Sequence, residues 1–378
     1  MPLVPCRVRL TGATVLRDGV LQRRSVAIED GRVSKGPLPE VDLTGFHILP
    51  GIVDLHAPAL DAFGSLAEAW VHADRMAVSR GVTTCWTTQA WSWEGGLRAP
   101  EQTSAVLHAL DDHRRRALCD LRLQLRCEVN TADSQDFLMA TVQAHGVDSV
   151  LFENRLDGAR LLAETDRPAL MRQALAAGRS VEAHLAAMRR AEARRRDVPR
   201  HLCRLAEGFD TRGVVYGSLG DTDGETREYY TQIGAKLCAL PQRRPAAALA
   251  HAVGDPILLA ASDVLGQGPQ WHMLCGGLGN VLVSERNQSA LVPAAFRLVD
   301  EGLMGLPEAW AMLSSAPADI MRLTDRGRID YGLRADLVVI HAQRRTVEAV
   351  FCEGRIVWLT GEAAYRFAGL REARMAAE

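Results

Sequence analysis

Short apolar runs alternate with amphipathic helical patterns through most of the chain, and this alternation constrains its fold more than any other feature. The helical patterns include SLAEAWVHADRMAVSRG (65–81) and TSAVLHALDDHRRRALC (103–119). The apolar runs are VTTCWTT (82–88), LRLQLRCEV (121–129), SVLFEN (149–154), SVEAHLA (180–186), GVVYGS (213–218), KLCALP (236–241), PILLAAS (256–262) and GNVLVS (279–284). Buried strands that alternate with crossover helices predict a parallel sheet, and about eight such units match a (β/α)₈ barrel. Chemistry in such barrels occurs where the strands end.

The two ends of the chain predict antiparallel β-structure instead. The segments CRVRLTGATVLRDG (6–19) and RSVAIEDGRVSKG (24–36) alternate apolar and polar positions and break at glycine-containing turns, as hairpins do. ADLVVIHAQ (335–343), TVEAVFCEG (346–354) and RIVWLTGE (355–362) are further strand-length runs. We therefore predict an α/β protein in which residues 1–47 and 330–378 form one composite β-sandwich beside a barrel over 48–329.

Composition excludes several classes of function. A hydrophobic content of 47% supplies a buried core, and a net charge of −2 favours neither nucleic acid nor membrane surfaces as partners. The eight cysteines are scattered without a CxxC pair, which indicates reduced thiols in a cytoplasmic protein. No apolar run is long enough to suggest a membrane span.

Two motifs resemble the amidohydrolase superfamily. ILPGIVDLH (48–56) followed by GVTT (81–84) is similar to that superfamily's first two strands, and SSAPADIMRLTDRGRIDYGLRADLVVI (314–340) is similar to its return into the sandwich. LRCEV (125–129) and AAFRLVDEGLMGLPEAWAMLSSAPADIMRL (294–323) resemble the diphosphatase family of the carbon–phosphorus lyase (phosphonate) pathway. The resemblance implies a metal-dependent hydrolase that releases pyrophosphate from α-D-ribose 1-methylphosphonate 5-triphosphate.

The chain departs from this family at its first and third barrel strands. The family opens its site with His-x-Asp and an acid three residues later; here His56 and Asp61 remain, but Pro58 replaces the middle acid. Proline carries no side-chain ligand. Where the family has His-Leu-Arg-Cys-Glu, Gln124 stands in the place of the histidine and the arginine and glutamate are kept.

Later strand ends depart as well. The family's Asp-His after the next strand becomes Glu153–Asn154. We align the family's Ser-His-Asp-Asp with the run around His184, so that leucine and alanine at 185–186 replace the two acids. The late aspartate that orients and deprotonates water in amidohydrolases aligns with Glu285.

The resemblance implies a site made of the residues that remain at these positions. A hydrolytic metal site needs three or more converging nitrogen or oxygen ligands and an open position for water. The predicted metal ligands are His56, His184, Asp61 and Glu153, and the predicted catalytic base is Glu285. The predicted substrate-binding residues are Gln124, Arg126, Glu128 and Asn154.

The lysine content limits the metal centre. Many amidohydrolases bridge two metals with a carboxylated lysine, but the only lysines are Lys35, in the N-terminal β-segment, and Lys236, which falls late in the barrel. We therefore expect no carboxylated lysine and fewer than two ions of zinc, manganese or iron.

Each candidate also has a structural interpretation. His56 and His184 could hydrogen-bond to nearby groups without a metal, and Arg126 with Glu128 could be an ion pair inside the barrel. The arginine-rich run 188–204 is either a solvated helix face or a clamp for a polyanion. We interpret GSLGDTDGE (217–225) as a flexible turn.

Two functions of different classes follow. The first is a metal-dependent hydrolase of the phosphonate-pathway diphosphatase type, with an altered site and a small phosphorylated substrate. The second is a catalytically inactive paralogue that keeps the fold and has a binding or regulatory role. The resemblance also allows a homodimer, since barrels of this superfamily often dimerise.

Overall fold

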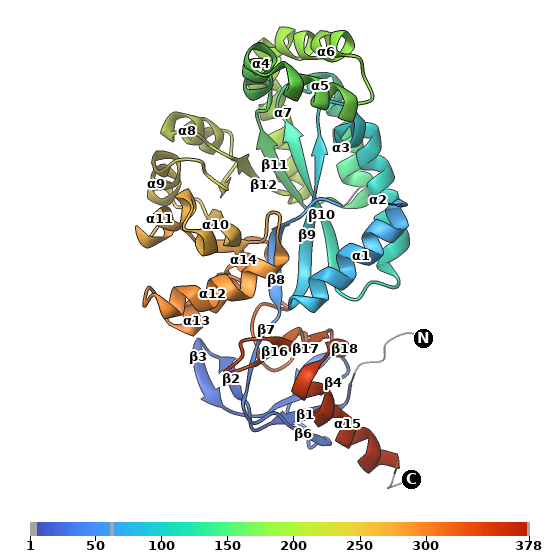
Figure 1. The fold of residues 1–378 in the computed structure, drawn as a ribbon, viewed down its shortest axis with the longest axis vertical. Helices are drawn as coiled ribbons and strands as arrows, with labels where there is room; N and C mark the ends of the chain where they lie inside the picture. The colour runs from blue at the N-terminus through green and yellow to red at the C-terminus, as the bar shows by residue number, and fades with distance from the viewer. Residues whose placement is uncertain (1–5, 61–63, 376–378) are drawn as a thin grey trace.

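The protein folds as a nearly closed eight-stranded parallel barrel beside a small β-sandwich (Figure 1). The computed structural model describes residues 6–60 and 64–375, with side chains up to residue 368. The barrel strands, in spatial order, are β8 (Ile52–Ala57), β9 (Val82–Trp91), β10 (Asp120–Glu128), β11 (Ser149–Glu153), β12 (Val215–Leu219), β13 (Leu237–Ala239), β14 (Ile257–Ala260) and β15 (Val281–Val283). A backbone hydrogen bond of 2.8 Å from the Glu285 N–H to the His56 carbonyl joins the two ends of this sheet.

The helices of the barrel follow one another in chain order, and most of them cover its outside. They are α1 (Leu66–Ser79), α2 (Pro100–Arg114), α3 (Gln135–His145), α4 (Leu156–Thr165), α5 (Arg167–Ala176), α6 (Val181–Ala193), α7 (Val198–Arg212), α8 (Gly224–Gln232), α9 (Arg244–Val253), α10 (Ala261–Gly266), α11 (Pro269–Cys275), α12 (Leu291–Asp300), α13 (Leu306–Ala311) and α14 (Ser315–Ile320). The first begins at a capping box in which the Ser65 hydroxyl accepts from the Glu68 N–H and the Glu68 side chain accepts from the Ser65 N–H.

The barrel strands are apolar on both faces, as parallel strands covered by helices require. Their outward side chains pack against the helices in one large cluster. Their inward side chains form a second cluster with Ala318 of α14 and the adjacent Met321. Because side chains alternate along a strand, Thr88 shares the inner face with the buried Trp86, and Arg126 shares it with Gln124. Polar residues that lie on the same inner face, closer to the carboxyl ends of the strands than this cluster, therefore face the carboxyl end of the barrel.

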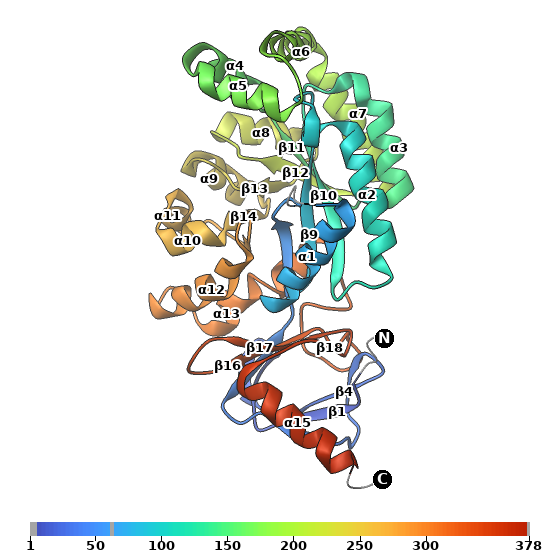
Figure 2. The same ribbon diagram turned by 45° about the vertical axis from the view of Figure 1, so that its right-hand side comes forward.

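Segments from both ends of the chain build the sandwich, which lies at the bottom of Figures 1 and 2. One sheet has the order β5-β4-β1-β6 and the other β18-β17-β16-β7-β2-β3. The strands are β1 (Val8–Thr11), β2 (Thr14–Arg17), β3 (Val20–Arg23), β4 (Val26–Glu29), β5 (Arg32–Ser34), β6 (Glu40–Asp42), β7 (Phe46–Pro50), β16 (Leu337–His341), β17 (Val347–Cys352) and β18 (Arg355–Leu359), and α15 (Gly361–Met375) packs on them. The predicted fold class is confirmed.

One predicted strand is wrong. Residues 180–186 belong to the start of α6, not to the barrel sheet. The Ser180 hydroxyl caps this helix by accepting from the Ala183 N–H, and the buried positions 184, 187, 188 and 191 have helical spacing. An apolar run this short does not distinguish a strand from a buried helix face. Helices α4, α5 and α6 pack on one another and lie beyond the carboxyl ends of the strands, at the top of Figure 2.

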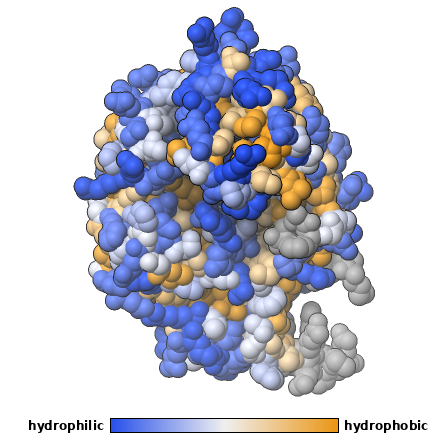
Figure 3. Space-filling view, turned by 45° about the horizontal axis from the view of Figure 1, so that its top comes forward, coloured by the Kyte–Doolittle hydropathy of each residue, from blue (hydrophilic) through white to orange (hydrophobic). Residues whose placement is uncertain are grey.

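The described part of the chain contains no helix long and apolar enough to cross a membrane. The face seen in Figure 3 is largely hydrophilic, with hydrophobic side chains gathered only in small patches.

Candidate functional site

A cavity of about 1120 Å³ opens at the carboxyl end of the barrel. All eight strands contribute to its wall, either from the strand itself or from the residues that follow it. The contributing residues, in strand order, include His56, Thr88, Arg126, Glu153, Leu219, Leu240, Ala260 and Glu285. The structure therefore brings several predicted site residues together at the end of the barrel where such folds carry out chemistry.

His56 lies at the floor of this cavity and is 3% exposed. Its Nδ1 is 2.5 Å from Oε1 of Gln124. Burial, together with the nearby charge of Arg126, lowers the pKa of His56 to about 4. The imidazole is therefore neutral throughout the physiological pH range.

Gln124 fixes which nitrogen of His56 carries the proton. The amide nitrogen of Gln124 donates to the Leu55 carbonyl at 3.0 Å and to the Ser149 hydroxyl at 2.8 Å. A carbonyl can only accept, so the amide oxygen of Gln124 must face His56 and accept from Nδ1–H. The Nε2 atom of His56 is then left with a lone pair, and His56 can act there only as an acceptor.

This environment makes the stability of the protein depend on pH. Between pH 6.5 and 4 the unfolded chain binds a proton at His56, whereas the folded protein does not. The contribution of His56 to the free energy of unfolding is therefore fully present above pH 6.5 and is lost as the pH falls toward 4. As the pH falls from 6.5 to 4, we expect the free energy of unfolding of a His56→Gln variant to fall by about 3 kcal/mol less than that of the wild type. Denaturant unfolding at several pH values measures the difference, and parallel curves for the two proteins would contradict it.

Three arginines and two glutamates form a second feature of the site, which we call the arginine cluster (Arg98, Arg126, Arg155, Glu94 and Glu153). Glu153 binds Nη2 of Arg126 at 2.7 Å and lies 3.5 Å from Nη2 of Arg98. Glu94 binds Nε of Arg98 at 2.8 Å and Nε of Arg155 at 2.9 Å. Both carboxylates are nearly buried, whereas each guanidinium keeps unused N–H donors. The cluster therefore holds one more positive than negative charge.

Glu128 lies behind this cluster and is not among the residues that line the cavity. It is fully buried, accepts from the Arg155 backbone N–H at 2.6 Å and accepts from the Asn130 amide at 2.8 Å. Burial raises the pKa of Glu128 to about 7. The sequence-based alternative of an ion pair between Arg126 and Glu128 is wrong, because Arg126 pairs with Glu153.

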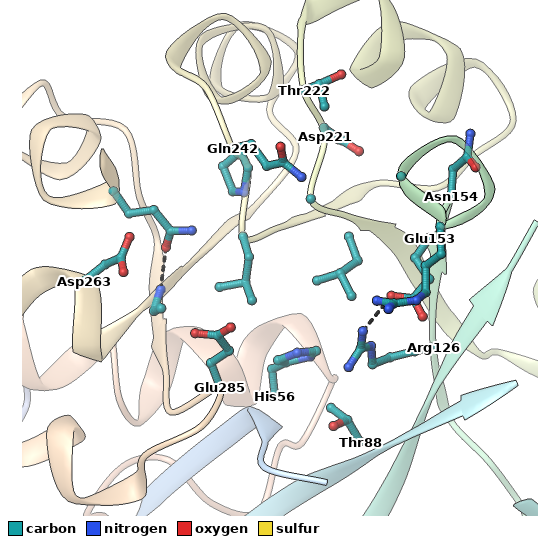
Figure 4. Close-up of a pocket in the computed structure, with 18 of the residues that line it drawn as sticks. His56, Thr88, Arg126, Glu153, Asn154, Asp221, Thr222, Gln242, Asp263 and Glu285 are labelled. Carbon is teal, nitrogen blue, oxygen red and sulfur yellow. Dashed lines mark hydrogen bonds and ion pairs between the residues drawn. The ribbon is translucent and has the colours of Figure 1, made fainter. Parts of the chain in front are cut away.

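Glu285 and Asn154 lie on opposite walls of the cavity. Figure 4 shows the Glu285 carboxylate beside His56 and pointing into the cavity. Its backbone adopts a left-handed conformation (φ 55°), which is uncommon for a non-glycine residue. Asn154 lines the cavity next to the arginine cluster, while its own side chain binds the Leu156 N–H and the Asp157 carboxylate.

His184, a predicted metal ligand, is not placed in the cavity. His184 lies on α6, is 1% exposed and is absent from the cavity lining. Its ring packs 5.8 Å from that of Trp93, and neither of its ring nitrogens has a hydrogen-bond partner among the described residues. Asp61 lies outside the described residues.

Asp221 is a cavity residue that the sequence analysis misinterpreted. It follows β12, is 2% exposed and binds the Ser218 hydroxyl and the buried Arg227, so the interpretation of this position as a flexible turn is wrong. The signal was present in the sequence. Ser-Leu-Gly-Asp (218–221) matches the family's Ser-His-Asp-Asp at its first and last positions, and it follows a strand, as His184 does not.

The arginine-rich run 188–204 does not form a clamp around the cavity, because none of its residues is among those that line it. Arg195 instead binds Asp157 at 2.9 Å, and Arg194 lies 3.9 Å from Asp133.

The described residues do not fit a metal ion by themselves. The resemblance to the amidohydrolase superfamily, whose members are typically metal-dependent, supports a divalent metal. Yet no three His, Cys, Asp or Glu side chains within residues 6–60 and 64–368 converge as a metal site. Glu153 is already bound by guanidinium groups, and His56 offers one lone pair.

Comparisons with known proteins agree with the motifs found in the sequence. No family model matches the chain. Alpha-D-ribose 1-methylphosphonate 5-triphosphate diphosphatase from Escherichia coli (strain K12) is 26% identical, over 84% of this chain and 90% of that protein. Its similarity supports a hydrolase.

Solved structures show the same fold. N-acetylglucosamine-6-phosphate deacetylase from Pasteurella multocida has a TM-score of 0.64 at 11% identity, covering 92% of this chain and 99% of the other. An amidohydrolase has a TM-score of 0.64 at 12% identity, with 94% and 100% covered. A D-hydantoinase has a TM-score of 0.55 at 13% identity, with 95% and 96% covered. The resemblance to the diphosphatase predicted from the sequence is confirmed, and these solved structures share the fold of the chain.

Proposed function

We propose that this protein is a hydrolase that cleaves a P–O bond of a small phosphorylated substrate in the barrel cavity. The observation that carries the proposal is the arginine cluster beside a neutral histidine. Guanidinium groups match phosphate oxygens with paired N–H donors, and the unused donors of Arg126 and Arg155 border the cavity. Arg126 and His56 both line the cavity, and Figure 4 shows their side chains next to each other.

The hydrolytic step uses Glu285 and His56 on one water molecule. In this mechanism the Glu285 carboxylate accepts one proton of the water, while Nε2 of His56 accepts a hydrogen bond from the other. The water oxygen forms a bond to phosphorus, and the leaving oxygen departs with the electron pair of the broken P–O bond and takes up a proton from solvent. Glu285 then releases the proton that it accepted to solvent. Gln124 keeps Nε2 unprotonated, and Arg126 stabilises the charge on the phosphoryl oxygens.

The reaction of the Escherichia coli relative, release of pyrophosphate from α-D-ribose 1-methylphosphonate 5-triphosphate, is the first specific candidate. The binding of zinc, manganese or iron in fewer than two equivalents stays a prediction. The roles given to Glu285, His56 and Arg126 in the hydrolytic step do not involve a metal. Elemental analysis of protein purified without chelators, with a His56→Ala variant beside it, measures whether a metal is bound and whether it depends on this histidine.

A turnover screen tests the proposed function. The wild type is incubated with phosphorylated sugars, nucleotides and the relative's substrate, and the release of phosphate and of pyrophosphate is measured separately. We expect release from at least one substrate and its loss in a Glu285→Gln variant.

A non-catalytic binding protein is the second candidate. It is favoured by Pro58, which stands in the cavity wall where the family has an acid. Tight binding of a phosphorylated ligand without turnover, with or without added divalent metal, would support this candidate and contradict the hydrolase.

A further inference from the structure

The charge distribution of the cavity indicates the chemical class of the substrate. Resting on the proposed function, we infer that the substrate carries a single phosphoryl group on a hydroxyl-rich body, and not a di- or triphosphate chain. The inference keeps the hydrolysis of a P–O bond but excludes the triphosphate of the Escherichia coli relative as the substrate of this protein. One end of the cavity recognises the phosphoryl group through the arginine cluster, and the opposite wall recognises hydroxyl groups through carboxylate and amide oxygens.

Most of the positive charge that lines the cavity belongs to the arginine cluster, because the other lining guanidinium, that of Arg286, is paired with Glu285. The three guanidinium groups of the cluster face two carboxylates, which leaves one surplus charge. A single phosphoryl group carries about −1.5 to −2 at neutral pH, so one such group already exceeds this surplus. Neither lysine of the chain lines the cavity.

The other charged groups of the cavity neutralise one another. Asp157 pairs with Arg195 at 2.9 Å, and Glu285 pairs with Arg286 at 3.0 Å. Asp263 lines the cavity without an ion-pair partner in the described part of the chain. A polyphosphate that extended away from the arginine cluster would therefore meet carboxylates.

The wall formed after β12, β13 and β14 is rich in hydrogen-bond acceptors. Figure 4 shows Asp221, Thr222, Gln242 and Asp263 around the side of the cavity away from Arg126. A backbone hydrogen bond of 2.9 Å from the Gln242 N–H to the Asp221 carbonyl joins two of these loops. Carboxylate oxygens accept hydrogen bonds from hydroxyl groups and repel phosphate oxygens.

Asp221 is held in place with one oxygen unused. Its Oδ2 accepts from the Ser218 hydroxyl at 2.6 Å and lies 3.3 Å from Nη1 of Arg227, while its Oδ1 has no partner among the described residues. A buried carboxylate oxygen without a partner is costly, and a hydroxyl group of a ligand would satisfy it after a small shift of the side chain, because the oxygen itself has almost no exposed surface. The cavity volume of about 1120 Å³ leaves room for such a ligand beyond one phosphoryl group.

Calorimetric titration of the wild type with four probes, in chelator and again with Mg²⁺, tests the inference. The probes are inorganic phosphate, pyrophosphate, tripolyphosphate and ribose 5-phosphate. We expect ribose 5-phosphate to bind at least tenfold more tightly than phosphate, and tripolyphosphate to bind no more tightly than phosphate. Tighter binding of tripolyphosphate than of ribose 5-phosphate would overturn the inference while leaving the proposed function intact. Failure of all four probes to bind would overturn the inference alone if the turnover screen finds a substrate, and would overturn both if it finds none.

Variants separate the two ends of the cavity. We expect Asp263→Asn and Asp221→Asn each to weaken ribose 5-phosphate about tenfold and to leave inorganic phosphate unchanged or slightly tighter. Arg126→Gln is expected to weaken both probes. Asp263→Asn serves as the independent variant if Asp221→Asn disturbs the fold through Arg227. An unchanged ratio of the two affinities in both asparagine variants would show that the acceptor wall does not contact the substrate.

Discussion

Replacing Glu285 with glutamine is expected to lower kcat by about 10²- to 10⁴-fold, the range associated with loss of a general base. The amide keeps the shape of the side chain but cannot take a proton from water at neutral pH. The substrate contacts of the arginine cluster do not involve this residue, so we expect KM and the affinity for inorganic phosphate to change less than threefold. Steady-state kinetics on the substrate found in the turnover screen, with phosphate titration, measures both.

A matched control is Glu301→Gln, which makes the same chemical change at an exposed residue just after α12 that pairs with Arg297. We expect its kcat to equal that of the wild type. If Glu285→Gln retained wild-type kcat, the water would have to be deprotonated by another group, and the proposed role of Glu285 would be wrong.

Replacing Arg227 with methionine is expected to destabilise the protein by about 3–5 kcal/mol, the cost of removing one partner from a buried ion pair. Arg227 is fully buried, with Asp221 at 3.3 Å and Asp255 at 3.5 Å, and it also donates to the Leu237 and Ala235 carbonyls. Methionine fills similar volume but leaves two buried carboxylates and two carbonyls without this donor. Chemical denaturation at neutral pH measures the loss.

The control for this variant is Arg328→Met, whose guanidinium binds Asp319 at 2.6 Å on the exposed surface. Exposed pairs contribute about 1 kcal/mol or less, so this change should be small. Equal stability losses in the two variants would contradict the prediction. The same experiment bears on the cavity, because Arg227 fixes the orientation of Asp221.

Features that depend on local pattern could be predicted from the sequence. Alternating apolar runs and amphipathic helices predicted the barrel, and glycine-separated strands at both ends predicted the sandwich. The resemblance to the diphosphatase family, and not the local pattern, assigned His56, Arg126, Glu153 and Glu285 to one site. Parallel strands end at one edge, and the structure places these four residues around one cavity there.

Features that depend on which groups face each other were decided only by the tertiary structure. The run at 180–186 has an apolar content that suits a strand or a helix, and a serine cap with helical packing made it a helix, which takes His184 away from the cavity lining. Whether Arg126 would pair with Glu128 or Glu153 depended on which carboxylate the barrel turns toward the cavity.

The roles of Gln124 and Asp221 show the same division most clearly. The sequence by itself determined that Gln124 replaces a family histidine, that Asp221 follows an apolar run, and that the chain builds a barrel with polar strand ends. Only the tertiary structure decided that Gln124 holds His56 in one tautomer and that a buried arginine holds Asp221 in the cavity wall. The physical reason is that strand periodicity is a local property of the backbone, whereas hydrogen-bond partners and charge balance arise from residues far apart in the chain that burial brings together.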